Sequence, residues 1–193
     1  TAKMRRDGDI TSIERIEIAG LDGANLIASG TLGGGSRRVT LKLDAEKTDG
    51  IAAILAQVLP GPFSDGLARR APSLSPALLV ATLANNEADD TYDLEANGAL
   101  GGTELKANGK LTAKADIRIE LVLSGENTDS GRLSRQLSGS QRAVSSALPG
   151  SIQLSVKGNP RATMDVAIGG ALMGVSGDVR GAIKLFQPFV PFE

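Results

Sequence analysis

Apolar residues recur at every second position along much of the chain, and this period of two is the feature that most limits its fold. Successive side chains of a β-strand point to opposite faces, so such a stretch has one apolar and one polar face. Half-buried strands of this kind are typical of antiparallel sheets. The clearest apolar series are Ile16 and Ile18; Val39, Leu41 and Leu43; Ile117, Ile119, Leu121 and Leu123; Ile152, Leu154 and Val156; and Met164, Val166 and Ile168.

Short segments that contain glycine or proline separate these stretches and predict the turns between strands. Glycine adopts the positive φ that tight hairpins need. The predicted turns lie at Gly33-Gly34-Gly35, Gly101-Gly102, Asn159-Pro160 and Gly169-Gly170. Strands joined in this way form an antiparallel meander.

A helical pattern replaces the alternation after Glu46. Thr48 or Asp49 is suited to cap a helix whose apolar positions run from Ile51 to Leu59. The sequence Pro60-Gly61-Pro62 predicts where this helix stops.

Two shorter helices are predicted further along the chain. One runs from Phe63 to Arg70 and ends before Pro72, and a weaker one runs from Asp129 to Leu137. Set against the many alternating stretches, these helices predict an α+β fold that is mostly β. We expect an antiparallel meander of about ten strands that forms a curved, twisted sheet or groove with two or three short covering helices.

The chain contains no histidine and no cysteine among its 193 residues. This excludes thiol nucleophiles, serine–histidine dyads and the usual zinc ligand sets. We therefore predict no enzymatic activity, no metal and no cofactor. With 21 basic and 22 acidic residues the net charge is −1, which gives no electrostatic basis for binding nucleic acid.

The sequence also repeats itself after about 80 residues. Leu41 to Asp49 matches Leu121 to Asp129, and in both an alternating strand leads through Glu-x-Thr-Asp into a predicted helix. Upstream of these, Leu26 to Leu32 resembles Leu105 to Leu111, with a glycine inside each strand pattern. A glycine at such a place predicts a bulge, a bend or a close backbone approach. We treat residues 1–193 as a single β-rich repeat domain, with repeat 1 at about 13–70, repeat 2 at about 75–137, partial repeat 3 at about 150–180 and a tail at 181–193.

Two features of the sequence resemble those of a known family. They are the repeated hairpins, Tyr92–Leu111 and Met164–Val179, and the strand-to-helix joints, Glu46–Asp49 and Glu126–Asp129. Both resemble the AsmA-like family of Gram-negative envelope proteins, which includes the TamB-type proteins. The resemblance implies a long periplasmic protein that is tethered to the inner membrane by an N-terminal helix. It also implies a curved β-groove with an apolar lining that moves or shields lipids between the two membranes. The chain lacks the membrane helix of that pattern, so the tether is implied by the family alone.

A candidate lipid-binding surface comes from the strands at equivalent positions of the two repeats and from the strand that follows the second. Its residues are Val39, Leu41, Leu43, Ile117, Ile119, Leu121, Leu123, Ile152, Leu154 and Val156. If the strands lie in one sheet, these side chains form a continuous apolar strip that can shelter an acyl chain. The alternative is that the same residues form a closed core.

Two functions remain open from the sequence. The first is a non-enzymatic periplasmic module for lipid transport or envelope biogenesis, with phospholipid or another acyl lipid, and other envelope proteins, as partners. The second is an adhesin-like or surface β-repeat module that binds proteins or glycans. Aromatic residues, which adhesin repeats carry on their outer faces, make up only 3% of this chain.

Overall fold

A single antiparallel sheet dominates the structure, a computed structural model that describes residues 1–33, 37–58, 62–86, 91–113, 117–139 and 146–184. Within these residues the sheet has 11 strands in sequence order, so each strand pairs with its neighbour in the chain. The strands are β1 (Ala2–Asp7), β2 (Ile10–Ile18), β3 (Ala24–Leu32), β4 (Arg38–Ala45), β5 (Ala77–Asn86), β6 (Thr91–Leu100), β7 (Thr103–Ala113), β8 (Ile117–Asn127), β9 (Gly150–Gly158), β10 (Met164–Leu172) and β11 (Val175–Ile183). The predicted mostly-β α+β meander is confirmed.

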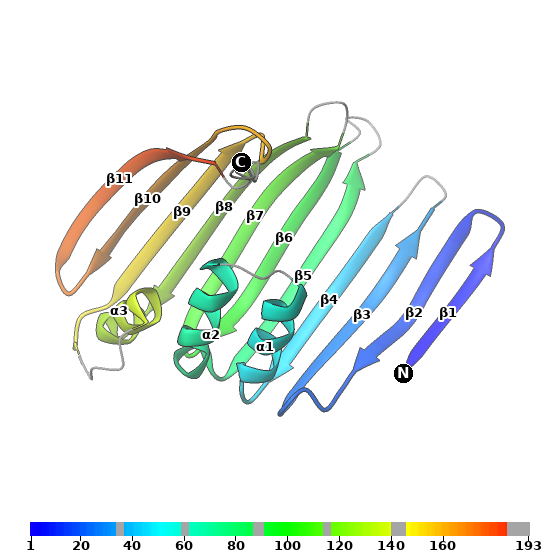
Figure 1. The fold of residues 1–193 in the computed structure, drawn as a ribbon, viewed down its shortest axis with the longest axis horizontal. Coiled ribbons are helices and arrows are strands. Elements are labelled where there is room, and N and C mark those ends of the chain that lie inside the picture. Colours follow the sequence, from blue (N-terminus) through cyan, green and yellow to red (C-terminus); the bar gives the residue numbers. More distant parts are fainter. Residues whose placement is uncertain (34–36, 59–61, 87–90, 114–116, 140–145, 185–193) are drawn as a thin grey trace, which may run out of the picture.

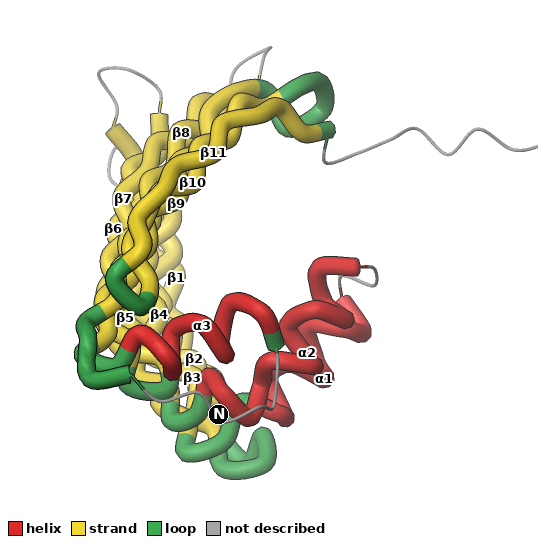
Figure 2. Tube along the Cα trace, turned by 90° about the vertical axis from the view of Figure 1, so that its left-hand side faces the viewer, coloured by secondary structure: helices red, strands yellow, loops and turns green. Residues whose placement is uncertain are grey.

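The sheet is strongly curved, and the helices lie on its concave side (Figure 1). Seen along the direction in which the strands stack, the strands follow a C-shaped path, and the helices cross the open side near one end of the C (Figure 2). We call this end, where β4 leads into α1 and β8 leads into α3, the helical end. The other end of the concave side has no described helix over it.

The helices are α1 (Asp49–Val58), α2 (Pro62–Leu74) and α3 (Ser130–Ser138). The prediction that the second helix ends before Pro72 is wrong, because the helix includes Pro72 and continues to Leu74. In the last turn a proline keeps the helical φ and removes only the single hydrogen bond of its missing N–H. The hydroxyl of Ser73 donates to Arg70 O at 2.8 Å and supports this last turn.

The two strand-to-helix joints begin their helices differently. Asp129 caps α3, because its carboxylate accepts from the backbone N–H groups of Gly131 at 2.8 Å and Arg132 at 3.2 Å. Thr48 precedes α1, and its hydroxyl donates to Ala71 O of α2 at 2.6 Å. Thr48 therefore ties the start of α1 to the end of α2.

Glycines separate or bend the strands according to their position. The predicted turns at Gly101-Gly102 and Asn159-Pro160 are confirmed, whereas Gly34 and Gly35 lie outside the described residues. The predicted turn at Gly169-Gly170 is wrong, because both residues lie inside β10. A Cβ on Gly170 would lie 2.3 Å from Ser151 O, so glycine is needed there for close packing of neighbouring strands.

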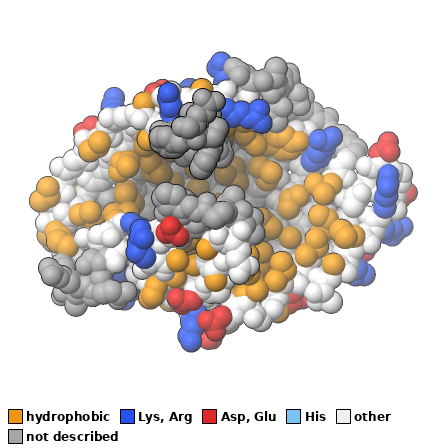
Figure 3. Space-filling model, viewed as in Figure 1, with side chains coloured by type: hydrophobic (Ala, Val, Ile, Leu, Met, Phe, Trp, Pro, Cys, Tyr) orange, Lys and Arg blue, Asp and Glu red, His pale blue; other side chains and the backbone are white. Residues whose placement is uncertain are grey.

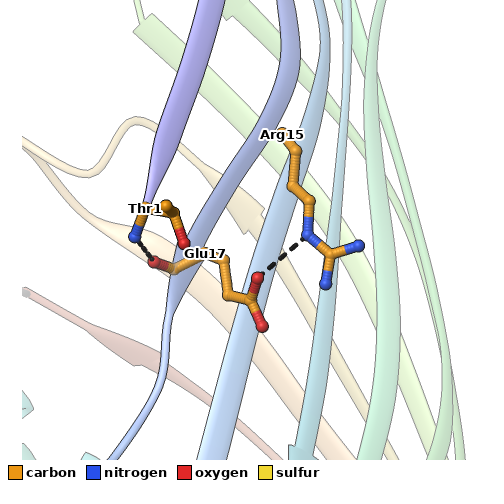
Figure 4. Close-up of polar contacts among 3 residues, drawn as sticks. All are labelled: Thr1, Arg15 and Glu17. Carbon is orange, nitrogen blue, oxygen red and sulfur yellow. Dashed lines mark hydrogen bonds and ion pairs between the residues drawn. The ribbon is translucent and has the colours of Figure 1, made fainter.

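The first two strands form a charged edge of the sheet. Thr1 and Glu17 exchange two backbone hydrogen bonds of 2.7 Å, and Arg15 Nε donates to Glu17 Oε2 at 3.0 Å (Figure 4). Lys3 pairs with Glu14 next to them, and this hydrogen bond and charge raise the pKa of Lys3. Charged side chains on an edge strand discourage pairing with other chains.

The fully buried core is small, and its cluster of packed residues lies at the helical end. Ala24, Ala45 and Ala77 form its cluster, with partly buried Leu43 and Leu100 packed against it. Among the described residues the only large apolar side chains that are fully buried are those of Leu133 on α3 and of Met164, which lies at the opposite end of the sheet. Most of the apolar residues of the sheet are therefore only half-buried.

Candidate functional site

Cross-strand pairing arranges the inward-pointing residues of the sheet in rows that run across the strands. Three adjacent rows each take one residue from every strand from β2 to β11. The row nearest the helical end, the lower row, is Ile18, Leu26, Leu43, Leu79, Gly98, Leu105, Gly125, Ile152, Gly170 and Gly177. The middle row is Ile16, Ala28, Leu41, Ala81, Ala96, Ala107, Leu123, Leu154, Ile168 and Val179. The upper row is Ile13, Gly30, Val39, Leu83, Leu94, Gly109, Leu121, Val156, Val166 and Gly181.

All residues of the three rows are Leu, Ile, Val, Ala or Gly, with no polar, charged or aromatic side chain. The rows lie on the concave face, because residues of the lower and middle rows line the two pockets beneath the helices. Figure 3 looks onto this face, where hydrophobic side chains gather in the hollow and charged ones lie mainly around it. The concave face is thus a continuous aliphatic surface.

The ten residues of the candidate lipid-binding surface all lie on this face. Leu43 and Ile152 belong to the lower row; Leu41, Leu123 and Leu154 to the middle row; and Val39, Leu121 and Val156 to the upper row. Ile119 and Ile117 follow beyond the upper row on β8. None of the ten is fully buried, and Leu41 is 43% exposed. The structure therefore joins the predicted residues into one strip, and their contact with lipid stays a prediction.

The part of the strip that lies between the two repeats was not predicted from the sequence. Strands β5, β6 and β7 separate β4 from β8 and contribute further leucines to the same rows, among them Leu79, Leu83, Leu94 and Leu105. Strands β10 and β11 extend the rows to the far edge of the sheet. The sequence did indicate the contribution of β10, because its apolar residues Val166 and Ile168 alternate with other residues as in the predicted strands.

The helices cover only the helical end of the strip. Residues of α1 and α2 enclose a pocket of about 160 Å³ against Leu43 and Leu79 of the lower row. Residues of α2 and α3 enclose a second pocket, of about 340 Å³, against the lower and middle rows. No residue of the upper row lines either pocket. Within the described residues, the helices therefore cover the strip at one end, and the upper row forms a groove that no described helix covers.

A buried polar network fixes α3 over the sheet. The side chain of Gln136 is buried, and its Nε2 donates to Ser73 O and Leu100 O, both at 2.9 Å, and to Gly101 O at 3.2 Å. Its Oε1 accepts from the hydroxyl of Thr103. The polar atoms of this network satisfy one another, as buried polar groups must.

Arg70 makes a second connection between the helices. Its guanidinium donates from Nε at 3.0 Å and from Nη2 at 2.7 Å to Leu137 O, at the end of α3, and from Nη1 to Gly66 O at 2.8 Å. A cation at a helix C-terminus satisfies free carbonyl groups and interacts favourably with the helix dipole. The three helices therefore form one connected layer over the lower row.

The upper rim of the groove is more polar than its floor. A pocket of about 300 Å³ is lined there by Leu32, Val39 and Leu83 together with Arg37 and Tyr92. Arg37 Nη1 donates to the hydroxyl of Tyr92 at 3.2 Å. The aliphatic strip thus borders on a cation and a phenol at this rim.

The convex face carries the charged residues of the same strands. One cross-strand row there alternates in charge: Asp93, Lys110, Glu120, Lys157 and Asp165. Lys157 Nζ lies 2.7 Å from Glu120 Oε1, and this hydrogen bond and charge lower the pKa of Glu120. Such exposed pairs add little to stability, but they give the sheet one strongly solvated face and one aliphatic face.

Within the described ranges, no three acidic side chains come together as ligands for a metal ion. None of the helices described is long and apolar enough to cross a bilayer. Comparison with known proteins finds no family model that matches the chain, and no match among curated proteins or solved structures.

Proposed function

We propose that the chain is a non-enzymatic lipid-binding module whose concave face holds acyl chains. The observation that carries this proposal is the strip of three rows without a polar side chain, of which the upper row has no helical cover among the described residues. Burying a methylene contributes about 0.8 kcal/mol, so a surface of this kind binds hydrocarbon without any specific polar contact. Soluble proteins rarely expose continuous apolar surfaces of this size unless they bind something there.

The dimensions of the strip suit a long, narrow ligand. Neighbouring strands lie about 4.8 Å apart, so the strip from β2 to β11 is about 43 Å long across nine strand spacings. The polar rim near Arg37 and Tyr92 provides a place where the aliphatic surface meets water. An acyl lipid, with an apolar chain and a polar head group, has the same division.

We place this module in the periplasm, within a larger AsmA-like protein tethered to the inner membrane, where it serves lipid transport or envelope biogenesis. The support is the resemblance of the repeated hairpins together with the curved sheet and its apolar inner face. Phospholipid or another acyl lipid is the proposed ligand, other envelope proteins are proposed partners, and nucleic acid is not one. The adhesin-like alternative has less support, because the concave rows offer no aromatic or polar side chain to a glycan.

A matched pair of charge substitutions tests the binding surface. Leu41 in the middle row is 43% exposed, and Val122 on the convex face of β8 is 41% exposed. Leu41→Asp and Val122→Asp therefore remove similar amounts of buried apolar surface and add the same charge. An unpaired carboxylate facing a bound chain costs several kcal/mol, so Leu41→Asp is expected to weaken binding of a fluorescent fatty acid by more than about 100-fold. Val122→Asp is expected to bind as the wild type does.

Circular dichroism and urea unfolding check that both variants remain folded. Equal binding by the two variants, or a wild type that captures neither fluorescent fatty acid nor phospholipid from vesicles, contradicts the proposed function.

A further inference from the structure

The two pockets beneath the helices lie end to end and share a wall. The larger pocket, beneath α3, is lined by Leu105, Leu123, Ile152 and other residues of β6 to β10, and the smaller lies beneath α1 and α2 against β4 to β6. Leu74 of α2 and Leu100 of β6 line both pockets. These two side chains therefore separate one covered space from the next.

The larger pocket has the length and the volume of part of an acyl chain. It extends from β6 to β10, which is four strand spacings or about 19 Å. An extended chain advances about 1.2 Å per bond, as the protein backbone does over its three bonds per residue, so 19 Å accommodates about 16 carbons. By volume, about 340 Å³ holds roughly 11 methylenes at about 30 Å³ each.

The lining of this pocket offers no free polar atom to a ligand. Its polar residues are Thr103 and Gln136. The hydroxyl of Thr103 donates to Gln136 and accepts from Asn127 Nδ2 at 2.8 Å, and the amide of Gln136 donates to three backbone carbonyls. The buried side-chain atoms without a hydrogen bond in the described part of the chain, Asn25 Oδ1 and Thr91 Oγ1, do not line it. An occupant without polar groups fits this lining, and a head group does not.

The opposite end of the pocket is open to the groove. Ile168 on β10 is 44% exposed and Leu137 on α3 is 38% exposed, and both line the pocket. A chain lying on the middle row reaches the pocket past Ile168, since Leu154 and Ile168 are neighbours in that row. The mouth therefore lies between Leu137 and Ile168, and the closed end lies at Leu74 and Leu100.

We propose that the pocket beneath α3 holds the methyl end of a single acyl chain, with room for about 11 to 16 carbons, and that Leu74 and Leu100 determine the length of chain it accepts. This inference rests on the proposed function and assigns one part of the groove a selective role. The carboxyl or head-group end of the chain stays outside the pocket, toward the open part of the strip.

A series of saturated fatty acids from 8 to 20 carbons tests the proposal, with each acid competing against a fluorescent fatty acid on the intact chain. Affinity is expected to rise about fourfold per added methylene while the pocket fills, which corresponds to about 0.8 kcal/mol. Beyond about 11 to 16 carbons the gain per methylene is expected to drop sharply, because further methylenes lie in the half-open groove.

Substitutions at the closed end of the pocket are expected to change the chain length at which the gain per methylene drops, which we call the break in the series. Leu100→Ala joins the two pockets and adds about 160 Å³, or roughly five methylenes. The break in the series should then shift by about four to six carbons toward longer chains. Leu74→Ala opens the same wall from the helix side and is the second variant, in case the loss of Leu100 from the core prevents folding.

A substitution at the mouth has a matched control on the neighbouring strand. Ile168→Trp narrows the mouth and is expected to lower the affinity for chains of 12 or more carbons at least tenfold. Val179 pairs with Ile168 in the middle row, is 70% exposed and does not line the pocket. Val179→Trp should therefore leave the series unchanged.

The results separate this inference from the proposed function. A wild type that binds no fatty acid of any length overturns both. Binding without a break in the series, or a break that Leu100→Ala and Leu74→Ala leave in place, overturns the pocket and keeps the groove. Equal effects of Ile168→Trp and Val179→Trp also overturn the pocket, because the mouth would then have no special position.

Discussion

Replacing Gln136 with alanine should release α3 from the sheet. The substitution removes the amide that donates to Ser73 O, Leu100 O and Gly101 O, and the oxygen that accepts from Thr103. Each net hydrogen bond contributes about 1 kcal/mol, and a buried group left without a partner costs about 1–3 kcal/mol. We therefore expect Gln136→Ala to lower the free energy of unfolding by about 2–4 kcal/mol.

The control is the same substitution at Gln57, which lies exposed on α1. Exposed substitutions usually change stability by less than about 0.5 kcal/mol, so Gln57→Ala should unfold at nearly the same urea concentration as the wild type. Gln136→Glu adds a second check, because a carboxylate of equal size accepts hydrogen bonds but donates none to the three carbonyls. If the free energies of unfolding of Gln136→Ala and Gln57→Ala differ by less than about 0.5 kcal/mol, the network does not hold α3 in place.

Two further outcomes follow from single residues elsewhere. Burial acts to raise the pKa of Asp129, but hydrogen bonds from the N–H groups of Ser146, Arg132 and Gly131, with the charge of Arg135, outweigh it and lower that pKa. The stabilising effect of the Asp129 carboxylate is therefore complete above the unfolded pKa of about 3.9 and is lost as pH falls through the lower folded pKa. In urea unfolding, the difference in stability between the wild type and Asp129→Asn should shrink below about pH 4. A difference in stability that does not change with pH contradicts this prediction. Gly98 has φ +151°, and a Cβ there would lie 2.0 Å from Leu78 O. Gly98→Ala should therefore lower the midpoint of urea unfolding strongly. The control is Gly177→Ala, whose added Cβ has no atom within 4 Å and which should leave the midpoint nearly unchanged.

The alternation of apolar residues correctly predicted which residues of a strand share one face of the sheet, because side chains two positions apart in a strand point to the same side. All ten candidate residues lie on the concave face for this reason. The glycine of the Leu26 to Leu32 motif also has the predicted role, since Gly30 lies where β3 approaches the backbone of β4 closely. Local pattern and backbone geometry were enough for these features.

Strand β5 shows where the pattern gave too little information. Its residues Leu78, Leu79 and Val80 are apolar on both faces, so the alternation that identifies a half-buried strand is absent. Leu79 lies beneath the helices, while Leu78 is exposed on the convex face. Only the pairing of β5 with β4 and β6 distinguishes the two sides, and this pairing depends on contacts between residues far apart in the sequence.

The wrong predictions at Gly169-Gly170 and Pro72 have a related cause. Glycine pairs favour turns, but Gly170 is required by the approach of Ser151 on β9, a contact that no local pattern reveals. Proline usually ends a helix, but at Pro72 it falls in the last turn, where Thr48 donates to Ala71 O and holds that turn from outside. In both places a contact from another element overrides the local preference.

Whether the strip is a core or a groove depends on the helices and not on the strands. An α-helix with its side chains is about 10 Å across, and neighbouring inward rows lie about 6.7 Å apart, two residues along a strand. One layer of helices therefore covers one to two rows. All three described helices lie at the same end of the strands, and Arg70 and Gln136 hold α2 and α3 there against the lower row. A second helical layer would be needed to cover the upper row, and the described residues provide none. The alternating strands thus specify an apolar face, and the described helices cover only the part of that face at the helical end.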